Sequence, residues 1–280
     1  MRSSTHPTVS VVIPTYNRAA LIARSLQSVL NQSYQDFEVI VIDDGSTDET
    51  ADVVAGFRDR RITYTRLANN TGAGAARNVG IQASKGKFLA FQDSDDEWLP
   101  KKLAKHMLMF EQGSPKLGVV YSDKQRILKN GTTRYHESPA IIPSRLVNPT
   151  TQFYQVFKLG IQSTVMKREC LDAAGSFNEA LPALEDLELF IRLSRQCDFC
   201  HIPEPLVKYY ETEGLSKDLY ANWVARKLLL KLYYKELLIP NAAFLLKECL
   251  WLGKTRLKAV REKRRRAAAR TATGSHPLQI

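Results

Sequence analysis

Up to about residue 123, the chain alternates between short apolar runs and longer segments whose apolar residues recur at helical spacing. This alternation predicts an α/β fold in which helices flank a mostly parallel sheet. Strands that are covered on both faces should be nearly continuous apolar runs, and the short runs of this segment have that character. The predicted strands are residues 9–13, 37–42, 62–65, 88–91 and 118–122; the predicted helices are 19–30 with Asn17 as its cap, one opening at Ser46 or Thr47, 75–84 and 100–111.

The pattern changes beyond Asp123. Asn130-Gly131 predicts a hairpin turn, and residues 138–150, with three prolines, predict a loop. A short strand (163–167) and two helices (168–174 and 184–193) are expected next, and from Leu219 two basic amphipathic helices broken at Pro240. We predict one domain over 8–212, in halves 8–123 and 124–212, a helical appendage over 213–262 and a disordered tail over 263–280.

Charge separates the appendage from the rest of the chain. From Lys217 to Arg270 there are 15 Lys and Arg against 4 Asp and Glu, a net of +11, and the whole chain is also +11 (40 minus 29). The remaining residues therefore balance, 25 against 25. This asymmetry predicts an anionic partner for the appendage, such as a membrane surface, with packing on the main domain as the alternative. Nucleic acid is not expected, because no recognition motif accompanies the charge.

The start of the chain and the cysteines predict a compartment. The short polar segment before residue 9 is not a signal peptide, and no apolar stretch reaches the roughly 18 residues of a spanning helix. We therefore expect a cytoplasmic protein with four reduced cysteines, with peripheral contact to the inner face of the plasma membrane as an option. Cys197-x-x-Cys200-His201 matches the c-type haem attachment pattern, but that chemistry requires export, so a chance occurrence in a strand near the sheet is the favoured interpretation.

Polar residues follow three of the predicted strands directly. Pro14-Thr15-Tyr16-Asn17, Asp43-Asp44 and Asp93-Ser94-Asp95 each stand at the carboxyl end of a strand. Ligands of open parallel sheets bind at that edge. The acidic groups, about 50 residues apart in sequence, are therefore expected to meet at one site.

The residue types at this edge indicate phosphate and metal chemistry. Carboxylates as close as Asp93 and Asp95 repel unless a cation binds, and oxygen ligands suit Mg²⁺ or Mn²⁺, which needs only one or two of them if it also binds a diphosphate. Arg77, beside a glycine-bearing helix start, is a candidate phosphate cation, although a simple packing turn is equally consistent. The neighbouring Asp96 and Glu97 are interpreted as helix caps.

Three more side chains suit the same site. Asp44 can accept hydrogen bonds from a base or a ribose, and Tyr16 can stack on the base. Asp186, at the start of a helix, can take a proton from a hydroxyl nucleophile. Helix-dipole complementarity is the alternative role for Asp186, and Glu185 competes as the base.

The chain resembles the inverting nucleotide-sugar glycosyltransferases of family two, which have the GT-A fold, a Rossmann-like sheet flanked by helices. The resemblance covers residues 8–212 in order and spacing. It is carried by Val11–Asn17, Val41–Asp48, Ala76–Asn78 with Gly80, Asp93–Trp98, Gly175–Glu179 and Glu185–Asp186.

The resemblance implies a metal-dependent hexosyl- or N-acetylhexosaminyltransferase. It implies that Asp95, with Asp93, holds Mn²⁺ or Mg²⁺ against the diphosphate and that Asp186 is the base, with Glu185 as second choice. The donor implied is a UDP-sugar, and the acceptor a saccharide or lipid-linked saccharide in bacterial surface polysaccharide or glycolipid assembly. The nucleotide-binding residues expected are Pro14, Thr15, Tyr16, Asn17, Asp44, Arg77 and Ser94.

Two other functions are weighed against this one. A nucleotidyltransferase also uses a metal at the edge of a parallel sheet, but it would carry a glycine-rich basic loop where Pro14–Asn17 stands. A non-catalytic protein that binds sugar nucleotides would not need the full set of carboxylates. The sequence leaves the sugar, the acceptor and the linkage open.

Overall fold

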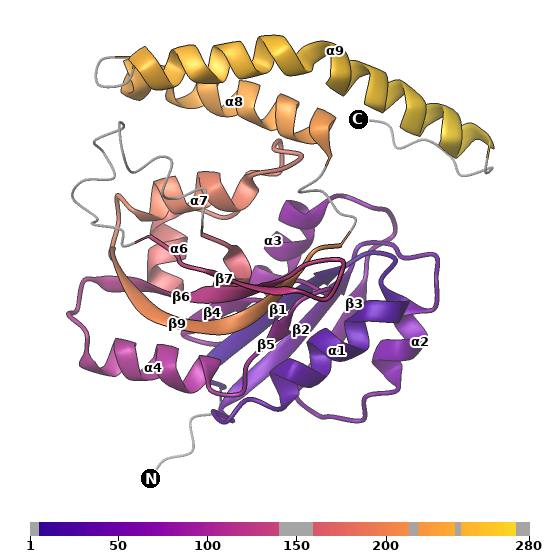
Figure 1. Cartoon of the computed structure of the whole chain (residues 1–280). Helices are drawn as coiled ribbons and strands as arrows, with labels where there is room; N and C mark the ends of the chain where they lie inside the picture. The colour runs from indigo at the N-terminus through magenta and orange to yellow at the C-terminus, as the bar shows by residue number, and fades with distance from the viewer. Residues whose placement is uncertain (1–5, 140–158, 213–217, 239–241, 273–280) are drawn as a thin grey trace.

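The computed structural model describes residues 6–139, 159–212, 218–238 and 242–272 (Figure 1). The predicted loop at 138–150 and the break at Pro240 fall largely or wholly outside these ranges. The strands are β1 (Val9–Thr15), β2 (Phe37–Asp43), β3 (Ile62–Arg66), β4 (Phe88–Phe91), β5 (Glu97–Trp98), β6 (Leu117–Ile127), β7 (Thr133–His136), β8 (Thr164–Lys167) and β9 (Asp198–Tyr210). The helices are α1 (Ala19–Leu30), α2 (Thr50–Ala55), α3 (Ala73–Ala83), α4 (Lys102–Gln112), α6 (Arg168–Ala174), α7 (Glu185–Leu193), α8 (Leu219–Leu238) and α9 (Ala242–Ala272).

The strands form one sheet in the order β3-β2-β1-β4-β8-β6-β9-β5, with β7 paired to β6. Strands β3, β2, β1 and β4 are parallel, as the alternating pattern predicted. Beyond β4 the sheet is mixed, because β8 lies antiparallel between β4 and β6. The predicted hairpin at Asn130-Gly131 is confirmed, since it joins β6 to β7.

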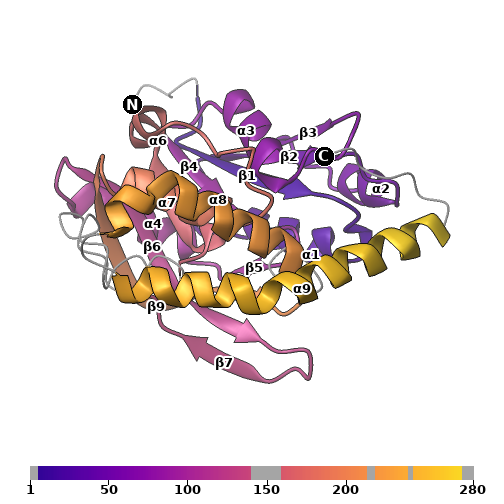
Figure 2. The same cartoon turned by 90° about the horizontal axis from the view of Figure 1, so that it is seen from above.

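Helices cover both faces of the sheet and bury a core on each side. On one face, Ile22 and Leu26 of α1 pack with Leu103 of α4 beneath β1 and β2. On the other, side chains of α6 and α7 pack with the sheet, and Ala225 and Tyr233 of α8 join the same cluster. The first of the two C-terminal helices is thus packed into the core of the main domain (Figure 2).

The starts of the first two helices differ from the prediction. Asn17 does not cap α1; the backbone N–H of Ala19 donates to Asp48 Oδ2 at 3.0 Å, and that of Arg18 donates to Thr50 Oγ1 at 2.9 Å. Helix α2 begins at Thr50 rather than at Ser46 or Thr47. The two differences are connected: residues 44–49 stay outside a helix, and Asp48 of this loop accepts from the start of α1.

Strand β5 was not predicted, and β9 was predicted only at its start, where Cys197–His201 was expected in a strand near the sheet. Pro203 and Pro205 argue against a strand because proline cannot donate to a ladder. Strand β9 nevertheless pairs along β6 by shifting register between Ser122 and Lys124, opposite these prolines. Asp96 and Glu97 were predicted to cap a helix, but Glu97 belongs to β5 and α4 starts only at Lys102.

The two predicted C-terminal helices are present as α8 and α9, and they pack against each other along their length (Figures 1 and 2). Helix α9 continues to Ala272, ten residues past the point where we expected disorder, because alanine and arginine are strong helix formers. In the parts of the chain that the structure describes, no helix is long and apolar enough to cross a membrane.

The residues of the Cys197-x-x-Cys200-His201 motif lie in three different surroundings. Cys197 is buried beside Cys170, and the two thiols share a hydrogen bond. Cys200 packs with the cluster of Leu117 and Ile202, while His201 Nε2 lies 2.7 Å from Asp123 Oδ1. All four cysteines are free thiols.

Candidate functional site

The loops after β1 and β2 are joined to each other at the carboxyl edge of the sheet. The backbone N–H of Asp44 donates to the carbonyl of Thr15 at 2.8 Å. Asn17, at a φ of +51°, donates its backbone N–H to Ser46 Oγ at 2.9 Å and accepts from the N–H of Thr47 at 2.8 Å. The left-handed backbone of Asn17 is one that asparagine tolerates better than most residues. Pro14 and Thr15 are buried, whereas the Tyr16 side chain beside them is 40% exposed and can meet a ligand.

Asp44 connects this edge to the start of α3. One carboxylate oxygen accepts from the N–H of Thr71 at 2.7 Å, and the other accepts from the N–H of Gly72 at 2.8 Å. Gly72 has a φ of +95°, which a residue with a side chain rarely adopts. The Thr71 hydroxyl also donates to Asp44 Oδ1 at 2.8 Å, so Oδ1 already accepts twice, and only Oδ2 keeps a second lone pair that could accept a hydrogen bond from a nucleoside.

The acidic run after β4 is anchored through its backbone. Ser25 Oγ donates to the carbonyl of Asp93 at 2.9 Å, and Arg24 donates to that of Asp95 at 2.5 Å. Thr212 Oγ1 donates to the Asp95 carboxylate at 2.5 Å, and Arg18 lies 3.9 Å from it. With the backbone fixed from α1, the two carboxylates keep their positions at the sheet edge.

Asp93 and Asp95 fit a divalent cation by their chemistry. Burial, together with repulsion from Asp95, raises the pKa of Asp93 against the lowering effect of Arg77. Two carboxylates that repel in this way gain from a cation between them. Among the described residues no three His, Cys, Asp or Glu side chains form a cation cage. An ion here would thus take one or two carboxylates and complete its shell with ligand oxygens and water, as Mg²⁺ does with phosphates.

Arg77 joins the acidic run to the start of α7. Its buried guanidinium donates to Asp93 Oδ1 at 2.9 Å and to Glu185 Oε1 at 2.6 Å. The sequence suggested Arg77 as a phosphate ligand; in the structure its two terminal nitrogens contact carboxylates from opposite halves of the domain. Those two charged hydrogen bonds fix the distance between the acidic run and the start of α7.

Asp186 lies in the first turn of α7, two residues after Leu184, whose φ is +61°. The N–H of Leu187 donates to Asp186 Oδ1 at 2.8 Å. Burial and the adjacent Glu185 charge raise the pKa of Asp186 to about 6, against the lowering effect of Arg77. A carboxylate with such a pKa is ionised at pH 7 and more basic than an ordinary aspartate. Backbone strain before it is common at functional positions.

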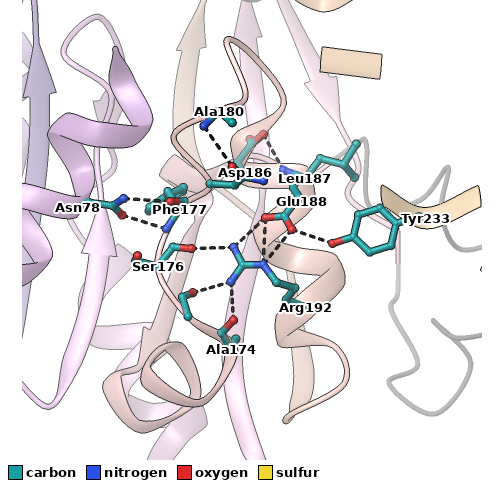
Figure 3. Close-up of polar contacts among 12 residues, drawn as sticks. Asn78, Ala174, Ser176, Phe177, Ala180, Asp186, Leu187, Glu188, Arg192 and Tyr233 are labelled. Atoms are coloured by element: carbon teal, nitrogen blue, oxygen red, sulfur yellow. Dashed lines mark hydrogen bonds and ion pairs between the residues drawn. The ribbon is translucent and has the colours of Figure 1, made fainter. Parts of the chain in front are cut away.

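Asn78 of α3 holds the loop that precedes α7. Its amide donates to the carbonyl of Phe177 and accepts from the N–H of Phe177, each at 2.9 Å (Figure 3). The amide also donates to Glu179 at 2.7 Å. This double contact fixes the loop against α3. It thereby links two of the sequence motifs, Ala76–Asn78 and Gly175–Glu179.

Helix α7 is held on its other side by a buried ion pair. Arg192 donates to the Glu188 carboxylate at 2.7 and 2.9 Å and to the carbonyls of Gly175 and Ser176 at 2.7 Å (Figure 3). Tyr233 of α8 donates to the same carboxylate at 2.7 Å. The position of Asp186 therefore depends on α8 as well as on the sheet.

We expect Tyr233→Phe to lower the free energy of unfolding by about 1.5–3 kcal/mol, because a buried hydrogen bond to a charged group is lost. Urea denaturation measures this loss. The matched control is Tyr220→Phe, whose hydroxyl accepts only a 3.2 Å contact from an exposed lysine, Lys263. Equal losses in the two variants would show that α8 does not support α7 through Glu188.

Two buried charged residues near the acidic run were not recognised from the sequence: Asp96 was interpreted as a helix cap, and Lys124 was not singled out. Asp96 is buried and accepts from the N–H of Tyr210 at 2.9 Å and from Gln162 at 3.0 Å. Burial and the charges of Asp93 and Asp95 raise its pKa well above the usual range. Lys124 is a buried cation among these carboxylates, and burial lowers its pKa. No local signal identifies either position, since their neighbours come from distant strands.

Comparisons with known proteins identify the family of the chain. The profile described as "Glycosyl transferase family 2" matches residues 10–167. The putative colanic acid biosynthesis glycosyl transferase WcaA of Escherichia coli K12 is 30% identical over 67% of this chain and 66% of that protein. The chain spans between 26% and 66% of the length of such relatives.

Two solved structures share the fold. S. aureus TarS 1-349 in complex with UDP-GlcNAc has a TM-score of 0.63 and 21% identity, covering 80% of this chain and 66% of that one. Mannosyltransferase PcManGT from Pyrobaculum calidifontis, in complex with GDP-Man and Mn²⁺, has a TM-score of 0.61 and 20% identity, covering 98% and 78%. The predicted GT-A fold is confirmed, and the chain belongs to glycosyl transferase family 2.

Proposed function

We propose that this protein is an inverting glycosyltransferase that moves a sugar from a UDP-sugar to an acceptor hydroxyl. One observation carries the proposal: Arg77 bridges Asp93 of the acidic run and Glu185 beside Asp186. Through this bridge a candidate base and a candidate diphosphate site lie at one edge of the sheet. The TarS complex contains UDP-GlcNAc and the PcManGT complex GDP-Man, so neighbours of this fold bind nucleotide sugars.

The donor site would be formed by the loops after β1, β2 and β4. Tyr16 presents an exposed ring for the base, and Asp44 offers the remaining lone pair of Oδ2 to the nucleoside. Asp95, supported by Asp93, would hold Mn²⁺ or Mg²⁺. When bound, that ion supplies positive charge to the diphosphate as its bond to carbon breaks.

Asp186 would take the proton of the acceptor hydroxyl. The oxygen then forms a bond to the anomeric carbon while the bond from that carbon to the diphosphate oxygen breaks, and the electron pair leaves with the diphosphate. A single displacement from the opposite face inverts the configuration. The raised pKa of Asp186, about 6, makes it a stronger base while leaving it ionised at neutral pH.

The class of acceptor follows from the relatives and from the C-terminal helices. The name of WcaA places that protein in colanic acid biosynthesis, so a surface polysaccharide or lipid-linked saccharide is the acceptor we propose here. We further propose that the enzyme works peripherally at the inner face of the plasma membrane.

We expect UDP release from UDP-GlcNAc to require Mn²⁺ or Mg²⁺ and to be lost on chelation. Asp95→Asn should raise the Mn²⁺ concentration for half-maximal activity by more than about 10-fold, the loss seen even for outer-shell partners of a metal. The matched control is Glu97→Gln, whose carboxylate already pairs with Lys208 at 2.8 Å. Metal-independent turnover, or equal shifts in both variants, would contradict the assignment of Asp95.

A further inference from the structure

Helix α9 presents a row of leucines to solvent. Leu246, Leu250 and Leu257 are 62%, 53% and 69% exposed, and their spacings of four and seven residues place them along one side of a helix. Glu248 and Ala259 are 5% and 0% exposed. Each lies two positions from a leucine of the row, about 200° around the helix, so the leucines face away from the buried side.

The buried side of α9 packs against α8. Trp223 donates to the carbonyl of Leu252 at 3.0 Å, and Arg226 donates to Glu248 at 2.7 and 2.8 Å. The Arg226 guanidinium also lies 4.5 Å from the centre of the Trp251 ring. These contacts fix the rotation of α9, so the leucine row does not belong to the packing of the helix pair.

Basic side chains surround Leu257 and follow Leu246 and Leu250 in the middle of α9. From residue 254 to 265 the chain has seven basic residues and one acidic residue, a net of +6, and all seven basic side chains are exposed. They are Lys254, Arg256, Lys258, Arg261, Lys263, Arg264 and Arg265. A second copy of this helix packed on the leucines would bring like charges together, whereas an anionic surface complements them.

We propose that the outer face of α9, defined by Leu246, Leu250 and Leu257 with six of these basic residues, binds an anionic lipid bilayer; Lys263 is left out because it contacts Tyr220 of α8. The leucines enter the boundary between head groups and acyl chains, and the basic side chains contact lipid phosphates. Leucines or charge alone would give weak binding, but the two act together on one rigid helix. The inference refines the membrane location proposed above and does not depend on the transfer chemistry.

The position of this face agrees with a lipid-linked acceptor. Helices α8 and α9 form a layer over the α7 side of the sheet (Figures 1 and 2). Tyr233 ties that layer to Glu188, two residues after Asp186. A bilayer on α9 therefore lies on the same side of the sheet as the proposed base.

Vesicle sedimentation of the full chain tests the proposal. We expect binding to phosphatidylglycerol–phosphatidylcholine vesicles, little binding to phosphatidylcholine alone, and release at high salt as the charges are screened. The triple variant Leu246→Ser, Leu250→Ser, Leu257→Ser should bind at least about 10-fold more weakly, since less apolar surface is buried. The double variant Lys254→Glu, Lys258→Glu should lose at least as much, because each basic residue contributes about five-fold.

Matched controls carry the same changes elsewhere on the surface. Leu108→Ser alters a leucine of α4 that is 44% exposed, and Arg58→Glu with Lys116→Glu reverses two exposed charges outside α9. Both should bind as the wild type does. Circular dichroism should show unchanged helix content in every variant.

Several results would overturn the proposal. They are a wild type that stays in the supernatant with anionic vesicles at low salt, a leucine variant that binds normally, and controls that lose as much as the α9 variants. A wild-type dimer that the leucine variant converts to a monomer would identify a second copy as the partner instead.

UDP release from UDP-GlcNAc, measured without vesicles, should be equal in wild type and α9 variants. Its absence from all of them would refute the transferase proposal while leaving the vesicle result intact.

Discussion

Asp186→Asn should lower the rate of sugar transfer by about 10²–10⁴-fold, the usual contribution of a general base. Asparagine has nearly the same shape, and its side-chain oxygen can still accept from the N–H of Leu187, so the fold should be kept. In the wild type, kcat/KM should fall as the pH drops below about 6, because Asp186 becomes protonated and cannot accept the proton of the acceptor. Initial rates across pH, with a saccharide acceptor, measure both effects.

Glu185→Gln is the matched control, because it removes the neighbouring carboxylate. It should keep far more activity than Asp186→Asn, because the amide oxygen of glutamine can still accept from Arg77. It should also move the acid limb of the pH profile to lower pH, since the Glu185 charge helps to raise the pKa of Asp186. If Glu185→Gln abolishes transfer and Asp186→Asn does not, the base is Glu185.

Local sequence was sufficient for the parallel half of the fold. Strands β1, β2 and β4 are buried apolar runs, and the polar residues that follow them lie at one sheet edge, because the carboxyl ends of parallel strands point the same way. The same reasoning places Asp44 and Asp93 at that edge.

The rest of the prediction failed where a residue's partner lies far away in the sequence. The start of α1 is capped by Asp48, about 30 positions away, although Asn17 is a good local candidate. Asp96 resembles a helix cap in the sequence, but it is buried and accepts from the N–H of Tyr210 in β9. The prolines of β9 disfavour a strand, so residue propensities do not predict it. The two carboxylates that bind Arg77 come from the acidic run after β4 and from α7, and no spacing rule connects them.

Arg77→Met should lower the free energy of unfolding by about 3–5 kcal/mol, the loss typical of a buried ion pair from which one partner is removed. Methionine fills the space of the side chain stem but leaves Asp93 and Glu185 without their cation. The Arg77 side chain is 6% exposed, so water cannot replace it readily. Urea denaturation in the absence of divalent cations measures the loss.

The control for this variant is an exposed pair with a similar bond. Arg126 donates to Glu211 at 2.7 Å, but its side chain is 46% exposed, so Arg126→Gln should cost less than about 1 kcal/mol. Equal losses would contradict a structural role for Arg77. If Arg77→Met instead keeps its stability and loses affinity for UDP, Arg77 serves the phosphate, as the sequence suggested. A loss of stability with transfer falling in parallel would mean that Arg77 acts by holding the metal carboxylates and the base helix at a fixed separation.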